Sequence, residues 1–345
     1  MTRKTFKNII VTPELLAQVN PENIKLRDRF LKEKNSRSSD KTITGYLSDT
    51  NIFFVWNLLY NDNKFFVDIR KLEFSEFFGY CVEELKWGSA KYSRVKSCLS
   101  SFSGFIEKFY DDIYPNFRNV ILKAVENLPK CSARDKTILS ESQVEFIFKS
   151  LEDEGDKQMS CWLALAIASG CRFSELLRFT TDLIDEKNIA FDGIFLETTK
   201  SIKTKGRGKA GKMLVKYIIK ELFWDRYNVW LKERERILSE NGKVHNYIFI
   251  KKNGDPADDS TARGWINEIQ KFVDVPFYAH SLRHYATTYL SKMKIPHVLI
   301  KELFGWESVD MVLVYDDVQA KDKSWSELEN LKQHLNNKPE DDSSN

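Results

Sequence analysis

The sequence of 345 residues contains no uninterrupted apolar run near the roughly 18 residues of a membrane-spanning helix. Its N-terminus, MTRKTFKNIIVTPELL, also lacks the long apolar core of a secretory signal. Because both features are missing, we expect no membrane partner and a location in the cytoplasm.

Cysteine is scarce, and its positions show no pairing motif. The five cysteines stand at 81, 98, 131, 161 and 171, an odd number without any CxxC spacing. Two of them lie in or beside an apolar run, which favours buried reduced thiols over disulfides or a metal site. Nothing in the sequence resembles a zinc or magnesium cluster, so we expect neither a metal nor another cofactor.

An excess of one charge is missing as well. The formal net charge is +3, which is weak evidence for a nucleic-acid partner. The distribution is more informative, because residues 198–216 carry seven basic side chains and no acidic one. They are Lys200, Lys203, Lys205, Arg207, Lys209, Lys212 and Lys216. Such a run is ordinarily a mobile surface loop, but the seven-to-zero ratio favours a segment that binds an anion.

The length predicts two domains, each with its own core. In the first part, apolar residues at helical spacing predict helices over residues 20–34, 41–60, 74–85, 90–109 and 117–125. The basic residues on their polar faces are candidates for phosphate contact, or else part of a plain solvated surface. They are Lys41, Lys91, Arg94 and Lys96.

The second part of the chain predicts a mixture of helices and short strands. A helix begins near Ser140 or Ser142, and the nearly all-apolar segment 159–169 predicts a buried helix that Gly170 ends. Arg172 follows two residues later. Short strands are predicted over residues 188–191, 194–199 and 212–216, and further helices over residues 217–239 and 260–272.

One stretch, residues 280–317, could place four side chains around a single phosphate. A helix predicted over residues 281–292 puts two of them, three residues apart, on one face. A second helix would end at Gly305, immediately before Trp306, the third of these side chains. The four are His280, Arg283, Trp306 and Tyr315.

This order, HxxR, then Gly-Trp, then a Tyr before a polar tail, resembles that of the tyrosine recombinases, also called the phage integrase family. The family further needs a second Arg, an acidic residue shortly after it, and a Lys. GCRFSELLRF supplies Arg172 and Glu175, and TTKSIKTKGRGK supplies Lys200, 28 residues past Arg172. Arg172 and Glu175 alone would be interpreted as a surface ion pair, whereas the complete set in this order is specific.

The resemblance implies a mainly α fold with a small antiparallel β-sheet, organised as a two-domain DNA clamp. Residues 1–126 would form a helical core-binding domain, whose aromatic-rich helices resemble that of the family but also fit a plain helical bundle. Residues 127–137 would be a linker, residues 138–320 the mixed α/β catalytic domain, and residues 321–345 a C-terminal helix with an acidic tail.

The resemblance also implies a site-specific recombinase or integrase that cuts and rejoins DNA strands through a 3′-phosphotyrosyl bond, without metal or ATP. Its partners would be a double-stranded recombination site and further copies of the chain. We expect a tetramer on two DNA sites, with the C-terminal helix exchanged between protomers.

Each residue of the set has a role in that chemistry. Arg172 and Arg283 would bind the two non-bridging phosphate oxygens, because a guanidinium is planar and always charged. Tyr315 would be the nucleophile, His280 would accept its proton, and Lys200, with Lys203 as the alternative, would protonate the leaving oxygen.

The other members of the set would support these groups. Trp306 stands where most relatives carry a second His, and its indole can only donate a hydrogen bond. Glu175 would orient the pocket. Further DNA contacts are expected from Lys203, Lys205, Arg207, Lys209 and Lys212. Two alternatives share these residues: a type IB topoisomerase or telomere-resolving strand transferase, and a DNA-binding protein that has lost catalysis.

Overall fold

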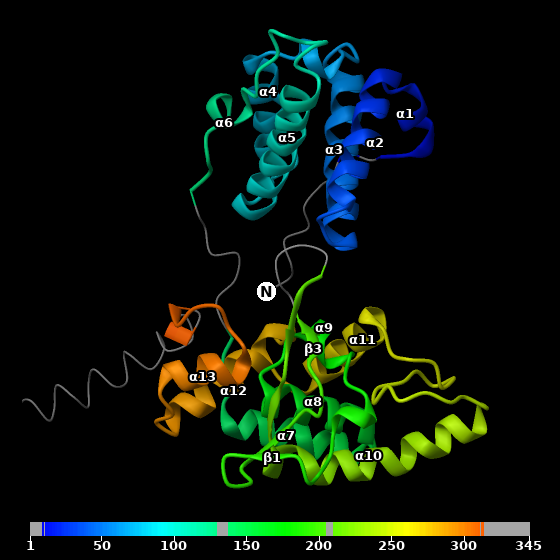
Figure 1. Cartoon of the computed structure of the whole chain (residues 1–345), viewed down its shortest axis with the longest axis vertical. Helices are drawn as coiled ribbons and strands as arrows, with labels where there is room; N and C mark the ends of the chain where they lie inside the picture. Colours follow the sequence, from blue (N-terminus) through cyan, green and yellow to red (C-terminus); the bar gives the residue numbers. More distant parts are fainter. Residues whose placement is uncertain (1–8, 10, 130–136, 205–209, 311, 314–345) are drawn as a thin grey trace, which may run out of the picture. The chain divides into compact units, whose positions relative to one another are not determined.

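The structure is a computed structural model and describes residues 9, 11–129, 137–204, 210–310, 312 and 313 (Figure 1). The chain forms two compact units, one within Met1–Asp135 and the other made of Lys136–Thr204 and Lys212–Asn345. Each unit has its own buried apolar cluster. The fold is mainly α-helical with small antiparallel sheets, as the sequence predicts.

The first unit is helical throughout its regular structure. Its elements are α1 (Pro13–Gln18), α2 (Pro21–Asn35), α3 (Asp40–Tyr60), the 3-10 turn η1 (Phe66–Asp68), α4 (Lys71–Glu83), α5 (Ser89–Phe109) and α6 (Ile121–Ala124). Four predicted helices are thereby confirmed with small shifts at their ends. The predicted helix over residues 117–125 is much shorter. It begins only at Ile121, because the Asn119 side chain donates a hydrogen bond to the Ser100 carbonyl and accepts one from the Ile121 N–H.

Phenylalanine rings fill the core of this unit. The ring centroid of Phe53 lies 4.9 Å from that of Phe77, and Phe66 lies 4.6 Å from Phe102. All four side chains are fully buried. Such tilted and edge-to-face pairs add to the free energy that apolar burial provides. The aromatic stripes therefore identify the core-facing sides of these helices correctly.

The prediction that Lys96 lies on a polar face is wrong. Its side chain is buried, and its ammonium donates to the Val125 carbonyl and to Oδ1 of Asn127 at 2.9 Å. A buried cation needs such partners, and here they tie α5 to the segment after α6. Arg94 is exposed, but its guanidinium is paired at 2.7 Å with the buried Asp49.

The second unit is built around one buried helix. Its helices are α7 (Glu141–Asp153), α8 (Lys157–Ser169), α9 (Phe173–Leu176), α10 (Lys220–Glu240), α11 (Asp259–Ile269), α12 (Ala279–Lys292) and α13 (His297–Phe304), with 3-10 turns η2 (Thr181–Leu183) and η3 (Gln270–Phe272). Helix α8 is buried from Met159 to Ser169, as predicted, and α7, α10 and α12 pack against it. The Ser140 side chain caps α7.

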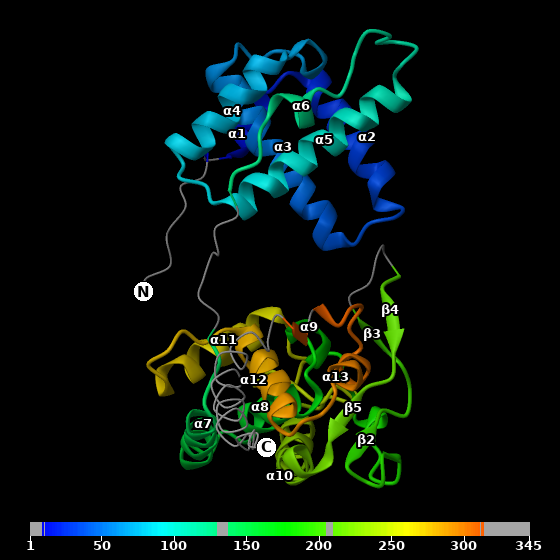
Figure 2. The same ribbon diagram turned by 90° about the vertical axis from the view of Figure 1, so that its left-hand side faces the viewer.

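Two small antiparallel sheets complete this unit (Figure 2). One has the order β1 (Ile189–Ala190), β2 (Phe195–Glu197), β5 (Tyr217–Ile219), and the other pairs β3 (Ile202–Thr204) with β4 (Lys212–Leu214). The sequence did not predict β3 or β5. The predicted start of a helix at Tyr217 is wrong, because Tyr217–Ile219 pairs with β2 and places Ile218 opposite Leu196 in the core.

The cysteine prediction is confirmed as far as burial is concerned. Cys81, Cys98, Cys161 and Cys171 are buried and free, while Cys131 lies outside the described residues. Burial in apolar surroundings raises the pKa of each of these four thiols. Over the described part of the chain, no helix combines the length and apolar character that a membrane crossing requires.

Candidate active site

Two glycines at helix ends shape the candidate site. Gly170 ends α8 with φ +55°, and Gly305 ends α13 with φ +64°. A Cβ on Gly170 would lie 2.5 Å from the ring of Phe304. No other residue type therefore fits at this position, because the left-handed backbone and the close ring both exclude a side chain. The C-terminus of α8 and the C-terminus of α13 meet here.

Arg283 lies at this meeting point. It is buried on α12, with 2% of its surface exposed, and its Nη1 donates to the Gly170 carbonyl at 2.7 Å. Its guanidinium carbon is 4.4 Å from the ring centroid of Trp306. A guanidinium stacked on an indole keeps its fork geometry and its charge. The structure thus brings together two residues that are 23 positions apart in the sequence.

Arg172 is the first residue before α9, two positions after Gly170. Its backbone N–H donates to Oε2 of Glu175 at 3.0 Å, and its guanidinium donates to Oε1 at 3.0 Å. The Glu175 side chain is only 1% exposed and that of Arg172 is 23% exposed. The pair is therefore mostly buried, and the alternative of a plain surface ion pair is wrong.

The structure adds Lys216, which the sequence showed only as one member of the basic run. Its side chain is 1% exposed, and its Nζ lies 3.9 Å from Oε2 of Glu175. The Nζ also donates to the Phe304 carbonyl at 3.3 Å. Lys216 thus lies beside both Glu175 and the helix end that precedes Trp306. Lys216 directly precedes β5, a strand whose middle residue is buried, and this position is the signal that could have indicated its burial. The sequence did not predict β5, so the signal was missed.

The remaining predicted residues of the second unit are exposed or lie outside the described residues. His280 is exposed in the first turn of α12, one turn before Arg283. Lys200 is 73% exposed, and its Nζ is 3.5 Å from Oδ2 of Asp182. Lys203 and Lys212 are exposed on β3 and β4. Tyr315, Lys205, Arg207 and Lys209 lie outside the described residues.

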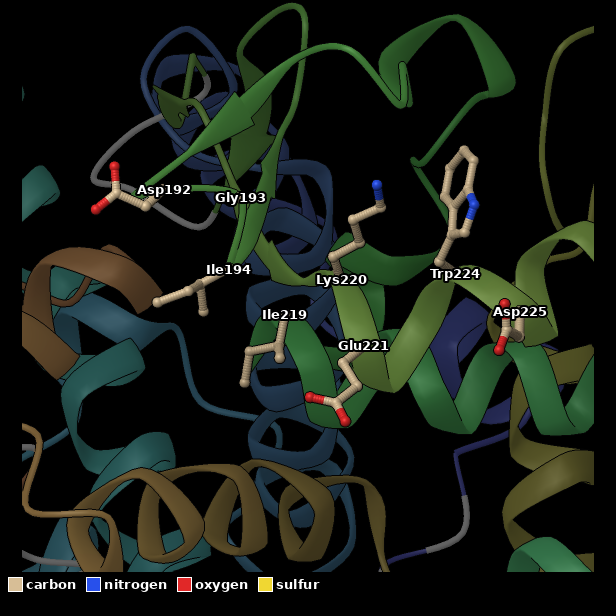
Figure 3. A pocket seen from close by; sticks show the side chains of 8 residues that line it. All are labelled: Asp192, Gly193, Ile194, Ile219, Lys220, Glu221, Trp224 and Asp225. Atoms are coloured by element: carbon tan, nitrogen blue, oxygen red, sulfur yellow. The ribbon is translucent and has the colours of Figure 1, made fainter.

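One surface pocket of about 440 Å³ lies elsewhere in the second unit (Figure 3). Its lining side chains come from the turn between β1 and β2, from the end of β5 and from the first turns of α10. They include three acids, Asp192, Glu221 and Asp225, and one cation, Lys220. None of the residues predicted for catalysis lines it, and its acids would repel a phosphate.

The buried Arg283 and the partly exposed Arg172 are two guanidiniums that suit an anion with several oxygens. Residues 137–322 match the sequence model of a protein family that is described as "Phage integrase family". The chain belongs to the phage integrase family. This match covers more than half of the chain, and it includes every residue predicted for catalysis. The protein is therefore a site-specific tyrosine recombinase.

The chain is also similar to two curated proteins. The "SPbeta prophage-derived recombinase-like protein YomM" of Bacillus subtilis (strain 168) is 24% identical over 266 residues, 74% of this chain and 75% of that protein. "Transposase B from transposon Tn554" of Staphylococcus aureus is 25% identical over 246 residues, 68% of this chain. The matched part is only 36% of the transposase, so most of that protein has no counterpart in the alignment.

Solved structures of similar fold belong to recombinases. XerH, in a post-cleavage complex with its palindromic difH substrate, has a TM-score of 0.63 and 17% identity over 94% of this chain and 100% of that one. A lambda integrase tetramer bound to a Holliday junction has a TM-score of 0.56 and 18% identity over 85% of this chain and 76% of that one. These likenesses confirm the two-domain recombinase fold.

Proposed function

We propose that this recombinase cleaves and rejoins double-stranded DNA through a 3′-phosphotyrosyl bond to Tyr315, with neither metal nor ATP. The observation that carries the proposal is the buried guanidinium of Arg283, stacked on Trp306 and anchored to the Gly170 carbonyl. Gly170 lies two residues before Arg172, the second guanidinium of the set. We infer that both guanidiniums face one phosphodiester, where each can bind one non-bridging oxygen.

The proposed step balances without an external reactant. The Tyr315 phenol oxygen forms a bond to phosphorus while the bond from phosphorus to the 5′ oxygen breaks. His280 accepts the phenol proton, and a lysine donates a proton to the leaving 5′ oxygen. Arg172 and Arg283 stabilise the added negative charge of the transition state. The bond energy is kept in the phosphotyrosyl link, so a 5′ hydroxyl of another duplex can reverse the step.

A nicked suicide substrate tests this function directly. A nick beside the scissile phosphate lets a short fragment diffuse away after cleavage, which prevents rejoining. The enzyme should accumulate as a covalent protein–DNA adduct that survives denaturation and forms in the presence of a chelator. A protein that only binds DNA would shift the substrate in a native gel and form no adduct.

The leaving oxygen needs a proton, and we propose Lys200 as its donor. Lys200 is exposed just before β3, and its ammonium pairs with Asp182 at the surface. Because the side chain is exposed, a bound DNA strand can reach it. Lys200→Ala should slow cleavage of ordinary DNA by about 10²- to 10⁴-fold, the usual contribution of a general acid. In a substrate with sulfur in place of the 5′-bridging oxygen, the sulfur leaves as a thiolate and needs no proton. The variant should cleave this substrate nearly as fast as the wild type does.

Lys203→Ala is the matched comparison for Lys200→Ala. Lys203 lies three residues further, on β3, and is also exposed. We expect this variant to bind DNA more weakly and to show no preference for the sulfur substrate. If the sulfur substrate instead restores Lys203→Ala and not Lys200→Ala, the acid is Lys203.

The first unit is proposed as the core-binding domain, and the second as the catalytic domain. Lys41, Lys91 and Arg94 remain candidates for phosphate contact in the first unit, whereas Lys96 does not, because it is buried. In the second unit, Lys203 and Lys212 on the β3–β4 hairpin are the described candidates. The proposal extends to Lys205, Arg207 and Lys209 on sequence grounds alone.

We further propose that the protein acts as a tetramer on two DNA sites, with its C-terminal helix exchanged between protomers. This segment lies outside the described residues, and the proposal depends on apolar residues at helical spacing after Tyr315. They are Trp325, Leu328, Leu331 and Leu335. Lambda integrase, which has the same fold, is a tetramer on its Holliday junction.

Removal of residues 321–345 should therefore separate DNA binding from assembly. Binding to one site uses surfaces that the truncation leaves in place, so affinity for a single site should remain. Joining of two sites into a synapse should be lost, because the contact between protomers is gone. Gel shifts with one and two sites measure both, and normal recombination by the truncated protein would contradict the exchange.

A further inference from the structure

Lys216 occupies a fixed place between two parts of the candidate site. It stands between β4 and β5, and its backbone is held by Thr198 on the neighbouring chain segment. The Lys216 N–H donates to Oγ1 of Thr198, and the Thr198 N–H donates to the Lys216 carbonyl, both at 2.9 Å. The sheet therefore determines where this ammonium lies, in contrast to the exposed lysines of the same basic run.

The first contact of Lys216 is Glu175. At 3.9 Å the two charged groups form an ion pair that is too long for a hydrogen bond. Burial by itself raises the pKa of Glu175, but the charge of Lys216 and the contacts with Arg172 outweigh it and hold the pKa below its ordinary value. Cys171 is a further titratable group beside this carboxylate, and burial raises the pKa of its thiol. Glu175 is thus an anion held between two cations.

The second contact of Lys216 is the end of α13. Carbonyls in the last turn of a helix lack partners within the helix, and a cation there is favourable. The ammonium of Lys216 is such a cation, and it donates a hydrogen bond to the carbonyl of Phe304, which precedes Gly305 and Trp306. A Cβ on Gly305 would lie 2.6 Å from Cδ1 of Leu214 and 3.5 Å from Nζ of Lys216. The chain segment that carries Lys216 is therefore packed tightly against the turn that leads to Trp306.

We propose that Lys216 is a positioning residue for strand cleavage, which joins the carboxylate that holds Arg172 to the helix end that places Trp306. The proposal rests on the proposed function. Lys216 is buried and acts through other residues. Because one ammonium spans both contacts, its loss would allow Arg172 and Trp306 to shift independently. The positive charge around the scissile phosphate would then no longer be held in one arrangement.

Lys216→Met tests this role, because it keeps the length of the side chain and removes the charge. We expect single-turnover cleavage to fall about ten- to a hundredfold, as for the loss of one charge-assisted contact, with unchanged DNA affinity. The pKa of Glu175 should rise without Lys216, so the variant should lose activity at mildly acidic pH where the wild type keeps it. A merely structural defect would lower the rate by the same factor at every pH.

Lys220→Met is the matched control. Lys220 is the first residue of α10, and its Nζ pairs with Glu186 at 3.2 Å, outside the candidate site. This variant loses the same charge and should cleave DNA as fast as the wild type. If Lys216→Met matches Lys220→Met at every pH while the wild type forms adducts, the role of Lys216 is refuted and the proposed function stands. If the wild type forms no adduct, the proposed function itself fails.

Two further measurements exclude other roles. On the substrate with a 5′-bridging sulfur, Lys216→Met should remain slow, and full recovery would make Lys216 the general acid and overturn the proposal. The double variant Glu175→Gln/Lys216→Met removes both buried charges, so it should fold even if the single variant does not. It should cleave slowly, and its rate should fall toward acidic pH no more steeply than that of the wild type, because no Glu175 carboxylate remains to be protonated. Cleavage at the wild-type rate would show that neither residue positions the site.

Discussion

Tyr315→Phe should abolish covalent attachment to DNA and leave binding to the recombination site unchanged. Phenylalanine keeps the ring and removes the one oxygen that can attack phosphorus, so no slower route through the same residue exists. Tyr315 stands nine residues after Trp306 in the sequence. The nicked substrate on a denaturing gel measures the adduct, and a gel shift measures binding.

The other tyrosines near the site serve as controls. Tyr285 and Tyr289 lie on α12, the helix that carries Arg283. Burial raises the pKa of Tyr285 to about 12 and also raises that of Tyr289. A phenolate is therefore costly at both positions, and Tyr285→Phe and Tyr289→Phe should still form the adduct. An adduct in Tyr315→Phe, or one mapped to Tyr285, Tyr289 or Tyr278, would assign the nucleophile elsewhere.

Arg283→Met should lower single-turnover cleavage by roughly 10²- to 10³-fold, the usual effect of losing one donor to a developing oxyanion. Methionine retains much of the packing against Trp306 but loses the charge. The variant should also be less stable by about 1–3 kcal/mol, because the buried Gly170 carbonyl loses its donor. Quench-flow or manual sampling of adduct formation gives the rate, and thermal unfolding gives the stability.

Arg234→Met separates these two effects. Arg234 on α10 is as buried as Arg283, at 2% exposure, and donates to the backbone carbonyls of Tyr247 and His245. Its partners are structural and lie outside the candidate site. This variant should therefore lose comparable stability and keep its cleavage rate per folded molecule. Equal rate losses in the two variants would mean that Arg283 serves the fold alone.

Local sequence determined most of the helices and the order of the site residues. The nearly all-apolar run of α8 has no polar face, so burial was predictable, and Gly170 marked its end because glycine readily adopts the left-handed backbone of a helix terminus. Gly305 likewise ends α13 with a left-handed backbone. The residues HxxR, Gly-Trp and the upstream Arg172 and Glu175 then identified the family, because a rare set in a fixed order carries information that does not depend on packing.

Tertiary structure decided which charged side chains are buried. Lys96 and Lys216 look like surface lysines in the sequence, because lysine is ordinarily exposed and no local pattern marks one for burial. Both are buried because the fold brings backbone carbonyls to them, those of Val125 and Phe304. The strand β5 was missed for a related reason, since three apolar residues fit either a helix or a strand until β2 pairs with them. Long-range contacts, which no local pattern encodes, placed Lys216 between Glu175 and the end of α13.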